Sequence, residues 1–499
     1  MKVVPNIRDA QTLAGEIDRP SLVPLAVTKD GIEDPAEVYL GVREKYDSSY
    51  LLESGENTEG GARYSVIGCR PLIYLKIQDG QKEIGGASEI VETSRERVEE
   101  MSDNADDLEI LRKAMFMNEM QFLGLNLPRY VLGVTGYLGY DYIQSKIDKE
   151  YDTEDDLGHP TLEFALPSLV MVFDHQEKNT YYVALMLLAN GSDFKTSYSD
   201  SVERLEELIS LEPSKPEESE RTISTNSNFE EEDFKKSVER IKEYIRAGDV
   251  IQTVISRRID LNPGPELGKF YTKLREINSS PYMFFLDFPE RSVVGSSPEA
   301  LVRVQDRRVL TRPIAGTRRR GKNESDDLQM ERDLIEDEKE RAEHVMLVDL
   351  GRNDIGKVSK FGSVETSEFM EIEKYGDVQH IVSTVTGDLQ DSKDSFDALR
   401  AVFPAGTVTG APKVRAMEII EELEPTRRGI YSGAVGTFSY TGDADFAITI
   451  RILTAGSESA QIQVGAGIVA DSKPELEFYE TENKARSLLR AAGVENEIN

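Results

Sequence analysis

The amino-acid sequence predicts an α+β fold built on large antiparallel β-sheets. Strand-like segments follow one another through residues 1–210, with few helices between them. Near the other end, residues 432–440, 445–454 and 460–469 are patterned as three strands separated by Gly/Asp or Gly/Ser turns, which is typical of an antiparallel meander. Internal repeats and a regular alternation of strand and helix are not evident, so the sequence favours α+β over a doubly wound fold.

Composition divides the chain into three parts. The strands expected in the first part are residues 50–54, 63–68, 71–77, 130–140, 168–173 and 180–188. A charged helical segment follows near residues 202–209. Residues 211–228 are rich in Pro, Ser, Glu and Thr, with almost no apolar content, which is typical of a linker or long surface loop. We therefore expect an N-terminal lobe over residues 1–210, this linker, and a C-terminal domain over residues 229–499.

The C-terminal domain is expected to mix helices and strands. Asn228 is a suitable N-cap for an amphipathic helix that ends at Gly248. Residues 251–259 alternate as a strand, with Gln252 on the face opposite Ile251. Further along, the patterns predict a helix over 331–350, turns over 351–356, a strand over 381–386, a helix from Asp394, a loop over 403–413 before another helix, and a last helix with Pro474 in its first turn.

The chain carries a large excess of negative charge. Its 59 Lys and Arg residues face 92 Asp and Glu residues, a formal net charge of -33. A surface this anionic argues against nucleic acid or anionic membranes as partners. One hypothesis is adaptation to high salt, where such charge is screened. No long apolar run or signal-peptide core is evident, so we expect a cytoplasmic protein, and the single Cys69 excludes an intrachain disulfide.

Two pairs of carboxylates are candidates for a metal site. Glu340 and Glu343 share a helical face with His344, and Glu477 and Glu480 share one with Lys484. Salt bridging on the surface is the alternative for both pairs. The apolar residues after His344 indicate that the helix end is buried, where carboxylates need a cation or hydrogen-bond donors. One histidine cannot complete a zinc-protease helix, so oxygen ligands favour magnesium.

Glycine-rich turns and isolated polar residues mark a possible anion site. The turns lie at residues 313–317, 406–410 and 465–467, where backbone N–H groups could hold carboxylate or phosphate oxygens, although simple tight turns remain the alternative. Arg451 lies in an apolar strand and needs either an anionic ligand or a structural partner. His380 is equally suited to proton transfer and to a satisfied place in the core. No phosphate-loop or serine-hydrolase motif is present.

Four long blocks of sequence resemble the chorismate-utilising enzymes, and within them the large subunits of anthranilate synthases. The blocks are DEKERAEHVMLVDLGRNDIGKV, FPAGTVTGAPKVRAMEII, GIYSGAVG and GAGIVADSKPELEFYETENKA. The resemblance covers nearly all of residues 229–499 and reaches into the N-terminal half. It implies antiparallel sheets packed as a sandwich with helices outside, and an active site in a cleft of a chorismate-binding C-terminal domain.

The resemblance also implies roles for individual residues. Glu343 and Glu480 match magnesium carboxylates, with Glu340 and Glu477 nearby. The implied catalytic residues are His380, Thr407 and Gln252, and the implied substrate contacts are Gly316, Thr317, Tyr431, Arg451, Gly465, Ala466, Gly467 and Lys484. The implied reaction uses Mg²⁺, aminates chorismate with ammonia and eliminates pyruvate to give anthranilate, the first step of tryptophan biosynthesis.

Two positions separate this reaction from its sister activities. Isochorismate and salicylate synthases resembling this family carry a lysine where Gln252 stands, which argues against hydration of the ring. Aminodeoxychorismate synthases carry a nucleophilic lysine in a PIKGT block, where this chain has Ala315. Aminodeoxychorismate synthase component I is therefore the second candidate. A non-catalytic tryptophan-binding regulator is a third, against which the retained Glu343, Glu480, Arg451 and His380 count.

The N-terminal half carries blocks that resemble the tryptophan-sensing region of the same enzymes. These are residues 51–54 and 63–65, and the implied inhibitor contacts are Ser54, Pro281, Tyr282 and Met283. The acidic, glycine-rich stretch between the first two blocks departs from the family pattern. Cys69 lacks the setting of a glutaminase nucleophile, so the resemblance implies a separate glutamine amidotransferase subunit that supplies ammonia within a heterotetramer.

Overall fold

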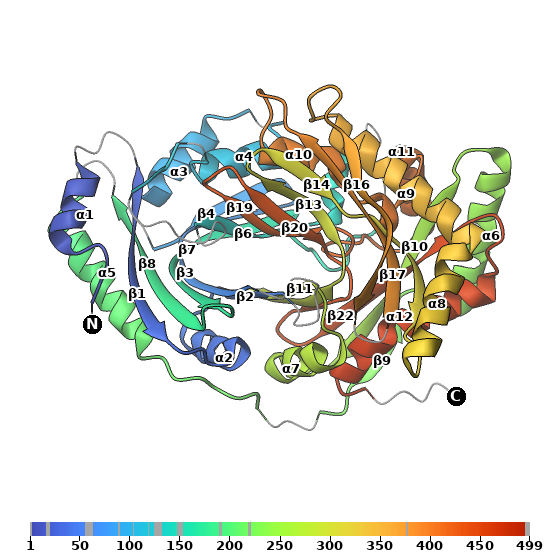
Figure 1. The fold of residues 1–499 in the computed structure, drawn as a ribbon, viewed down its shortest axis with the longest axis horizontal. Helices are drawn as coiled ribbons and strands as arrows, with labels where there is room; N and C mark the ends of the chain where they lie inside the picture. The colour runs from blue at the N-terminus through green and yellow to red at the C-terminus, as the bar shows by residue number, and fades with distance from the viewer. Residues whose placement is uncertain are drawn as a thin grey trace.

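Two arms of one antiparallel β-sheet face each other in the computed structural model, with helices around the outside (Figure 1). The structure describes residues 2–494 except 16–19, 55–62, 88–89, 103, 118, 124–131, 146, 148–152, 189–191, 218–220 and 376–377. The predicted α+β sandwich with outer helices is confirmed.

The described helices and strands follow in chain order. The α-helices are α1 (Ile7–Ala14), α2 (Pro35–Lys45), α3 (Ile90–Glu99), α4 (Asp107–Ala114), α5 (Phe194–Ile209), α6 (Glu231–Ala247), α7 (Leu267–Ile277), α8 (Glu324–Glu336), α9 (Glu338–Gly356), α10 (Ser395–Val402), α11 (Lys413–Leu423) and α12 (Pro474–Ala491), with short 3₁₀ turns η2 (Tyr140–Ser145) and η3 (Gly406–Val408). The strands are β1 (Ser21–Asp30), β2 (Ser49–Glu53), β3 (Tyr64–Gln78), β4 (Gln81–Gly85), β5 (Gln121–Phe122), β6 (Gly133–Leu138), β7 (Leu162–Asp174), β8 (Asn179–Leu188), β9 (Ser224–Ser227), β10 (Gln252–Asn262), β11 (Tyr282–Phe288), β12 (Arg291–Ser297), β13 (Ala300–Gln305), β14 (Arg308–Thr311), β15 (Ile314–Arg319), β16 (Glu365–Tyr375), β17 (Val378–Asp388), β18 (Gly410–Ala411), β19 (Ala434–Ser439), β20 (Ala444–Ile448), β21 (Ile452–Ala455) and β22 (Ala460–Ile468).

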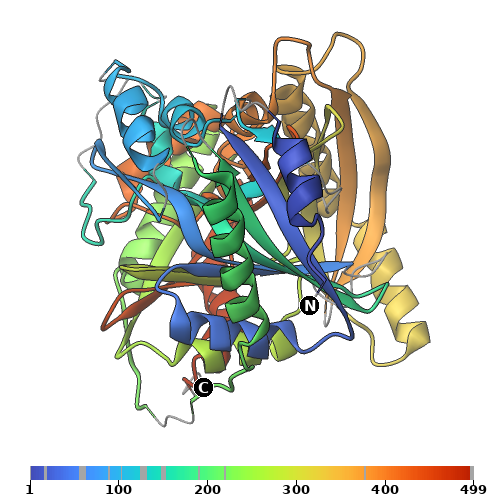
Figure 2. The same cartoon turned by 90° about the vertical axis from the view of Figure 1, so that its left-hand side faces the viewer.

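Both arms of the sheet start at β7. One arm runs through β3, β2, β11, β12, β21, β22 and β10, and the other runs through β6, β19, β20, β13, β14 and β17, with β15 and β16 paired to β17. The strands β8 and β1 extend the sheet beyond β7, and α5 lies across their outer face (Figure 2). Both arms therefore combine strands from the two halves of the chain.

Alternate residues of one strand serve two different cores. Phe284 and Leu286 of β11 point into the central core between the arms, together with Phe438 of the other arm. Phe285, between them in sequence, packs in an outer core beneath α2 and α7, with its ring 5.0 Å from that of Tyr39. Each of these buried aromatic side chains contributes about 1.5–3 kcal/mol of transfer free energy. The alternation of side chains along β11 thus places neighbouring residues in the central core and in the outer core.

Most helices and strands predicted from the sequence are confirmed, and several details differ. The N-cap of α6 is Glu230, because Asn228 is engaged elsewhere: its side chain accepts from the Arg258 backbone N–H and donates to Thr426. The helix expected over 331–350 is two helices, α8 and α9, which meet at Asp337. The turns expected over 351–356 are the last part of α9, since its tertiary contacts outweigh the weak helix propensity of Gly and Asn.

The strand expected over residues 445–454 is interrupted at Arg451. Its backbone takes a left-handed φ of 52°, between β20 and β21. Ile251 lies just outside β10 and is 62% exposed, so it does not share a buried face with the later isoleucines of that strand. Residues 224–227 of the predicted linker form β9 and pair with β10. The boundaries between lobe, linker and C-terminal domain remain predictions.

None of the helices that the structure describes is long and apolar enough to cross a membrane.

Candidate active site

The two pairs of carboxylates predicted from the sequence lie on α9 and α12. Gln252, the first residue of β10, donates from Nε2 to Glu343 Oε1 over 3.3 Å. Burial raises the pKa of Glu343, and the negative charges of Glu340 and Glu480 raise it further. The two helices therefore hold like charges close enough to interact, which joins elements that are far apart in the sequence.

The carboxylates of α9 and α12 fit a magnesium ion that takes most of its ligands from water and substrate. Within the described ranges, no group of three or more Asp, Glu, His or Cys side chains could hold a metal. Mg²⁺ is commonly bound through one or two carboxylates, with water and substrate oxygens completing the octahedron. Glu340 already has Arg318 as a partner at 3.1 Å and Glu480 has Lys484 at 2.8 Å. Glu343 has no such cation within ion-pair distance among the described residues.

His380 and Thr317 lie opposite each other in the pairing of β15 with β17. His380 Nδ1 is 3.0 Å from the carbonyl oxygen of Gly316 and 3.1 Å from Thr317 Oγ1. A carbonyl oxygen only accepts, so Nδ1 carries the proton of the neutral ring. Burial, with a smaller effect of the Arg451 charge, lowers the pKa of His380 to about 4. The imidazole is therefore neutral near pH 7, with Nε2 unprotonated.

The two glycines of β22 are closely approached by groups from neighbouring elements. Gly465 and Gly467 lie opposite Ser256 and Val254 of β10, with Ala466 between them. A Cβ atom on Gly467 would lie 2.7 Å from Gln252 Nε2, and one on Gly465 would lie 3.0 Å from the Tyr431 hydroxyl. Lys484 donates to the carbonyl of Gly465 over 2.9 Å. These contacts connect the predicted substrate residues of β22 with Tyr431, Lys484 and the carboxylates.

Arg451 is held in a sparsely populated backbone conformation at the break between β20 and β21. A left-handed φ in a residue other than glycine costs free energy and persists only where the surroundings enforce it. The guanidinium Nη1 lies 3.5 Å from Asn278 Oδ1, and burial lowers the pKa of the group. Its electrostatic partner is the carboxyl of Glu299. The arginine therefore interacts with an amide and with a buried acid.

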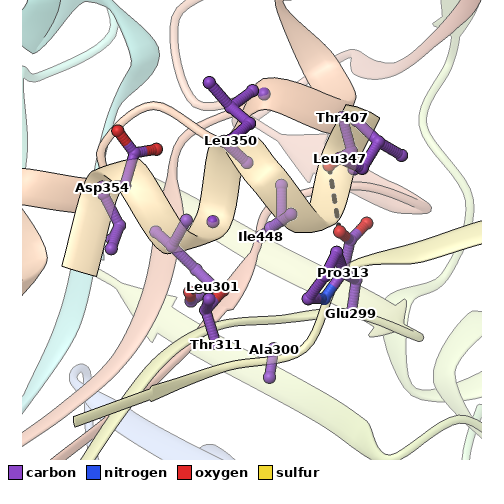
Figure 3. A pocket seen from close by; sticks show the side chains of 14 residues that line it. Glu299, Ala300, Leu301, Thr311, Pro313, Leu347, Leu350, Asp354, Thr407 and Ile448 are labelled. Carbon is purple, nitrogen blue, oxygen red and sulfur yellow. Dashed lines mark hydrogen bonds between the residues drawn. The ribbon is translucent and has the colours of Figure 1, made fainter. Parts of the chain in front are cut away.

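Glu299 is a candidate functional residue that the sequence reasoning missed. It lies between β12 and β13 and lines a cavity whose walls also include Leu347, Leu350 and Asp354 of α9 and the loop that carries Thr407 (Figure 3). Thr407 Oγ1 donates to Glu299 Oε1 over 3.0 Å. Burial raises the pKa of Glu299 to about 8, against the opposing effects of Thr407, the Ile314 N–H and Arg451. The carboxyl group therefore largely keeps its proton at neutral pH. The available signal was a lone carboxylate in the apolar run VVGSSPEALV.

The predicted inhibitor residues meet where β2 pairs with β11. Met283 lies opposite Glu53, the residue before Ser54, and Tyr282 and Pro281 precede Met283 in the chain. Glu53 accepts hydrogen bonds from Tyr271, Ser65 and Arg275. The two blocks that were joined only by resemblance are thus neighbours. The acidic stretch over 56–62 lies outside the described residues.

Comparison with known families agrees with this arrangement. The model of a family described as chorismate binding enzyme matches residues 70–490, which is most of the chain. The chain belongs to this family. Its sequence is also 42% identical over 471 residues to anthranilate synthase component 1 of Aquifex aeolicus (strain VF5), covering 93% of each chain.

Relatives with different named activities are about equally similar to this chain in sequence. Aminodeoxychorismate synthase component 1 of Bacillus subtilis (strain 168) is 41% identical over 451 residues, with 90% of this chain and 92% of the relative covered. The crystal structure of anthranilate synthase component I from Streptococcus pneumoniae TIGR4 superposes with a TM-score of 0.74 at 35% identity, covering 85% of this chain and 92% of that one. Family membership and fold are shown, whereas the choice between sister activities depends on single positions.

Proposed function

We propose that this chain is the chorismate-converting component of an anthranilate synthase. It aminates chorismate at C2 with loss of the C4 hydroxyl, and then eliminates pyruvate to give anthranilate. One observation carries the choice of reaction: Ala315 lies buried on β15, opposite Ile381, at the position where an aminodeoxychorismate synthase carries its lysine nucleophile. An alanine cannot attack the ring, so amination takes place directly with ammonia.

The proposed amination step uses the buried acid. Ammonia forms a bond to C2 as the C4–O bond breaks, and the departing hydroxyl needs a proton. Glu299 is protonated at neutral pH, is hydrogen-bonded to Thr407, and is the acid that we assign to this transfer. Arg451 lies near both Glu299 and His380 and is suited to bind a substrate carboxylate.

The proposed elimination step uses the neutral histidine. The proton on C2 is removed as the C3–O bond breaks, which aromatises the ring and releases pyruvate as its enolate, which then takes up a proton. His380 has its proton on Nδ1, which leaves Nε2 to accept the proton from C2. Its pKa of about 4 keeps the ring unprotonated before catalysis.

Magnesium is the metal that we propose for Glu343 and Glu480. When bound, Mg²⁺ would neutralise the substrate's ring carboxylate and stabilise the negative charge that builds up as the leaving group departs. The raised pKa of Glu343, caused by burial and neighbouring carboxylates, supports a site that gains a cation. Gln252 would orient Glu343 through its amide hydrogen bond.

We also propose the remaining elements that the family resemblance implies. A separate glutamine amidotransferase subunit supplies ammonia within a heterotetramer, and L-tryptophan binds between Ser54 and the segment Pro281–Tyr282–Met283 and inhibits the enzyme. The pairing of β2 with β11 supports the inhibitor site. The protein works in the cytoplasm, and its net charge of -33 suits high salt.

The product formed from chorismate tests the reaction. Purified chain is incubated with chorismate, ammonium and Mg²⁺, and the products are separated and identified by mass and fluorescence. Anthranilate and pyruvate in equal amounts are expected. Aminodeoxychorismate without pyruvate would establish the second candidate, the activity named for the Bacillus subtilis relative. Added glutamine is expected to replace ammonium only when an amidotransferase subunit is present.

A further inference from the structure

Arg428 is the largest fully buried side chain that the structure describes, and its guanidinium contacts several separate segments. Nη1 donates to the carbonyl oxygen of Val408 over 2.7 Å, and Nη2 donates to that of Val254 over 2.8 Å. The same group lies over the rings of Tyr140 and Tyr431, 4.7 and 5.8 Å from their centroids. One side chain therefore bonds to backbone groups from β10 and η3 and packs against a substrate-site tyrosine.

Each of the contacted segments carries part of the candidate active site. Val408 follows Thr407, whose hydroxyl contacts Glu299. Val254 lies opposite Gly467 in the pairing of β10 with β22. Tyr431, three residues after Arg428, has its hydroxyl against Gly465. Arg428 thus contacts three segments that carry site residues. None of its hydrogen bonds is made to a residue to which we assign a catalytic role.

Glu424 fixes the position of the guanidinium. Its carboxylate accepts from Arg428 Nη2 over 2.7 Å and from Nε over 3.0 Å, a bidentate arrangement. The same carboxylate accepts from the backbone N–H and the hydroxyl of Ser256, over 2.7 and 2.9 Å. Glu424 is 6% exposed and Arg428 is 2% exposed, so solvent does not compete for these bonds. The pair is therefore oriented by the strand that also bears Val254.

We propose that Arg428, held by Glu424, is a positioning residue that sets the geometry of the Thr407 loop and Tyr431 relative to the β10–β22 surface. This inference rests on the proposed function. A guanidinium presents its donors in a flat fork, which suits two carbonyls and a carboxylate at once. A lysine ammonium concentrates its donors at one point and cannot satisfy all three. Charge alone is therefore not sufficient at this position.

The substitution Arg428→Lys tests the proposal in the full chain. With saturating ammonium and Mg²⁺, we expect kcat to fall at least 30-fold while the KM for chorismate changes less than about threefold, because Arg428 does not touch the substrate. Circular dichroism at the assay temperature reports whether the variant is folded. Arg400→Lys is the matched control, because Arg400 bonds to Asp106 and Glu109, and the two bonds join α4 and α10. This control is expected to keep kcat within twofold.

A double-mutant comparison separates positioning from general structural support. If Arg428 acts through the Thr407 loop, adding Arg428→Lys to a Thr407→Val variant is expected to lower its kcat less than threefold further. Fully multiplicative losses, or an Arg428→Lys variant with wild-type kcat, would overturn the proposal. If Arg428→Lys does not fold, Glu424→Gln replaces it. This variant keeps an acceptor for Ser256 and is expected to lower kcat at least fivefold, and a kcat within twofold of wild type overturns the proposal.

The outcomes distinguish this inference from the proposed function. A wild-type chain that forms no product from chorismate contradicts the proposed function and this inference with it. A wild-type chain that forms anthranilate, together with unimpaired Arg428 and Glu424 variants, contradicts this inference alone. If aminodeoxychorismate is the product, the same comparison applies to its rate of formation.

Discussion

Thr407 donates a hydrogen bond to Glu299, with 3.0 Å between its Oγ1 and the carboxyl Oε1 (Figure 3). The bond joins the loop after α10 to the connection between β12 and β13, so two segments about a hundred residues apart in the sequence meet at one hydrogen bond. Because burial raises the pKa of Glu299 to about 8, the carboxyl group carries a proton of its own near neutral pH, in addition to the proton that Thr407 donates. Two predictions follow from this pair.

Removing the acid should slow amination. General acid catalysis contributes roughly 10²- to 10⁴-fold, so Glu299→Gln is expected to lower kcat by about that factor with a small change in KM. The matched control is Glu163→Gln, since Glu163 is also buried with a pKa raised to about 7 but pairs with Tyr137 in the N-terminal half. Steady-state kinetics with ammonium measures both. A Glu299→Gln variant with at least a tenth of wild-type kcat would contradict the assigned role.

The pH profile should report the same group. An acid must be protonated to donate, so kcat is expected to fall tenfold per pH unit above about 8, where Glu299 loses its proton. The Thr407 hydrogen bond stabilises the ionised form and lowers the pKa, so Thr407→Val should move this limb to higher pH. Profiles of kcat at saturating ammonia, with ammonia recalculated at each pH, test this. A limb that stays in place in the Thr407 variant speaks against the assignment.

Loss of either proposed metal carboxylate should weaken the activation of the enzyme by magnesium. Glu343→Gln and Glu480→Gln are each expected to raise the magnesium concentration for half-maximal activity at least tenfold, since each removes one charged ligand. EDTA should inactivate the wild-type chain and excess Mg²⁺ should restore it. Glu475→Gln, on an exposed face of α12, serves as the control and should change nothing. Equal magnesium dependence in all variants would place the metal elsewhere.

Tryptophan inhibition should be separable from catalysis. Ser54 follows Glu53, the last residue of β2, which lies opposite Met283 of β11, and it is outside the set of predicted substrate contacts. Filling that space with Ser54→Phe is expected to raise the tryptophan concentration for half-inhibition at least tenfold while kcat stays within twofold. Ser210→Phe, an exposed serine at the end of α5, is the control. The site assignment fails if Ser54→Phe is inhibited like the wild type.

Salt should stabilise a chain with a net charge of -33. The Debye length falls from about 10 Å at 0.1 M salt to about 3 Å at 1 M, which weakens repulsion between surface carboxylates. The unfolding temperature is therefore expected to rise steadily with potassium chloride, and sucrose of equal osmolality should have a smaller effect. Calorimetric scans measure this. An unfolding temperature that does not depend on salt contradicts the hypothesis of adaptation to high salt.

The sequence predicts those features of the site that neighbouring residues determine, and it does not predict those that depend on contacts between distant residues. Some signals depend only on neighbours in the chain. These are the alternation around Gln252, the capping residue Asp394 and Pro474 in a first turn, and the strand and the two helices that they predict are present. The left-handed turn at Arg451 is accompanied instead by a contact with Asn278, which lies 173 residues away in the sequence. Local pattern cannot supply such a contact.

Buried polar residues show the same limit. Arg428 occurs in the sequence EPTRRGIYSG, where a charged residue between turn-forming residues is expected on the surface. Its burial follows from carbonyls of β10 and η3 that only the folded chain brings together. Likewise, the shift of the Glu299 pKa depends on packing from α9 and the Thr407 loop. The resemblance to a family supplied several site residues, but it did not identify these two.

The most direct test of the central claim is the product that the purified chain forms from chorismate, ammonium and Mg²⁺. Turnover is followed by fluorescence in high potassium chloride, with and without tryptophan, and the products are confirmed by mass. The account predicts anthranilate with one equivalent of pyruvate, at a rate that tryptophan suppresses. Aminodeoxychorismate, isochorismate or unchanged chorismate as the outcome would contradict it.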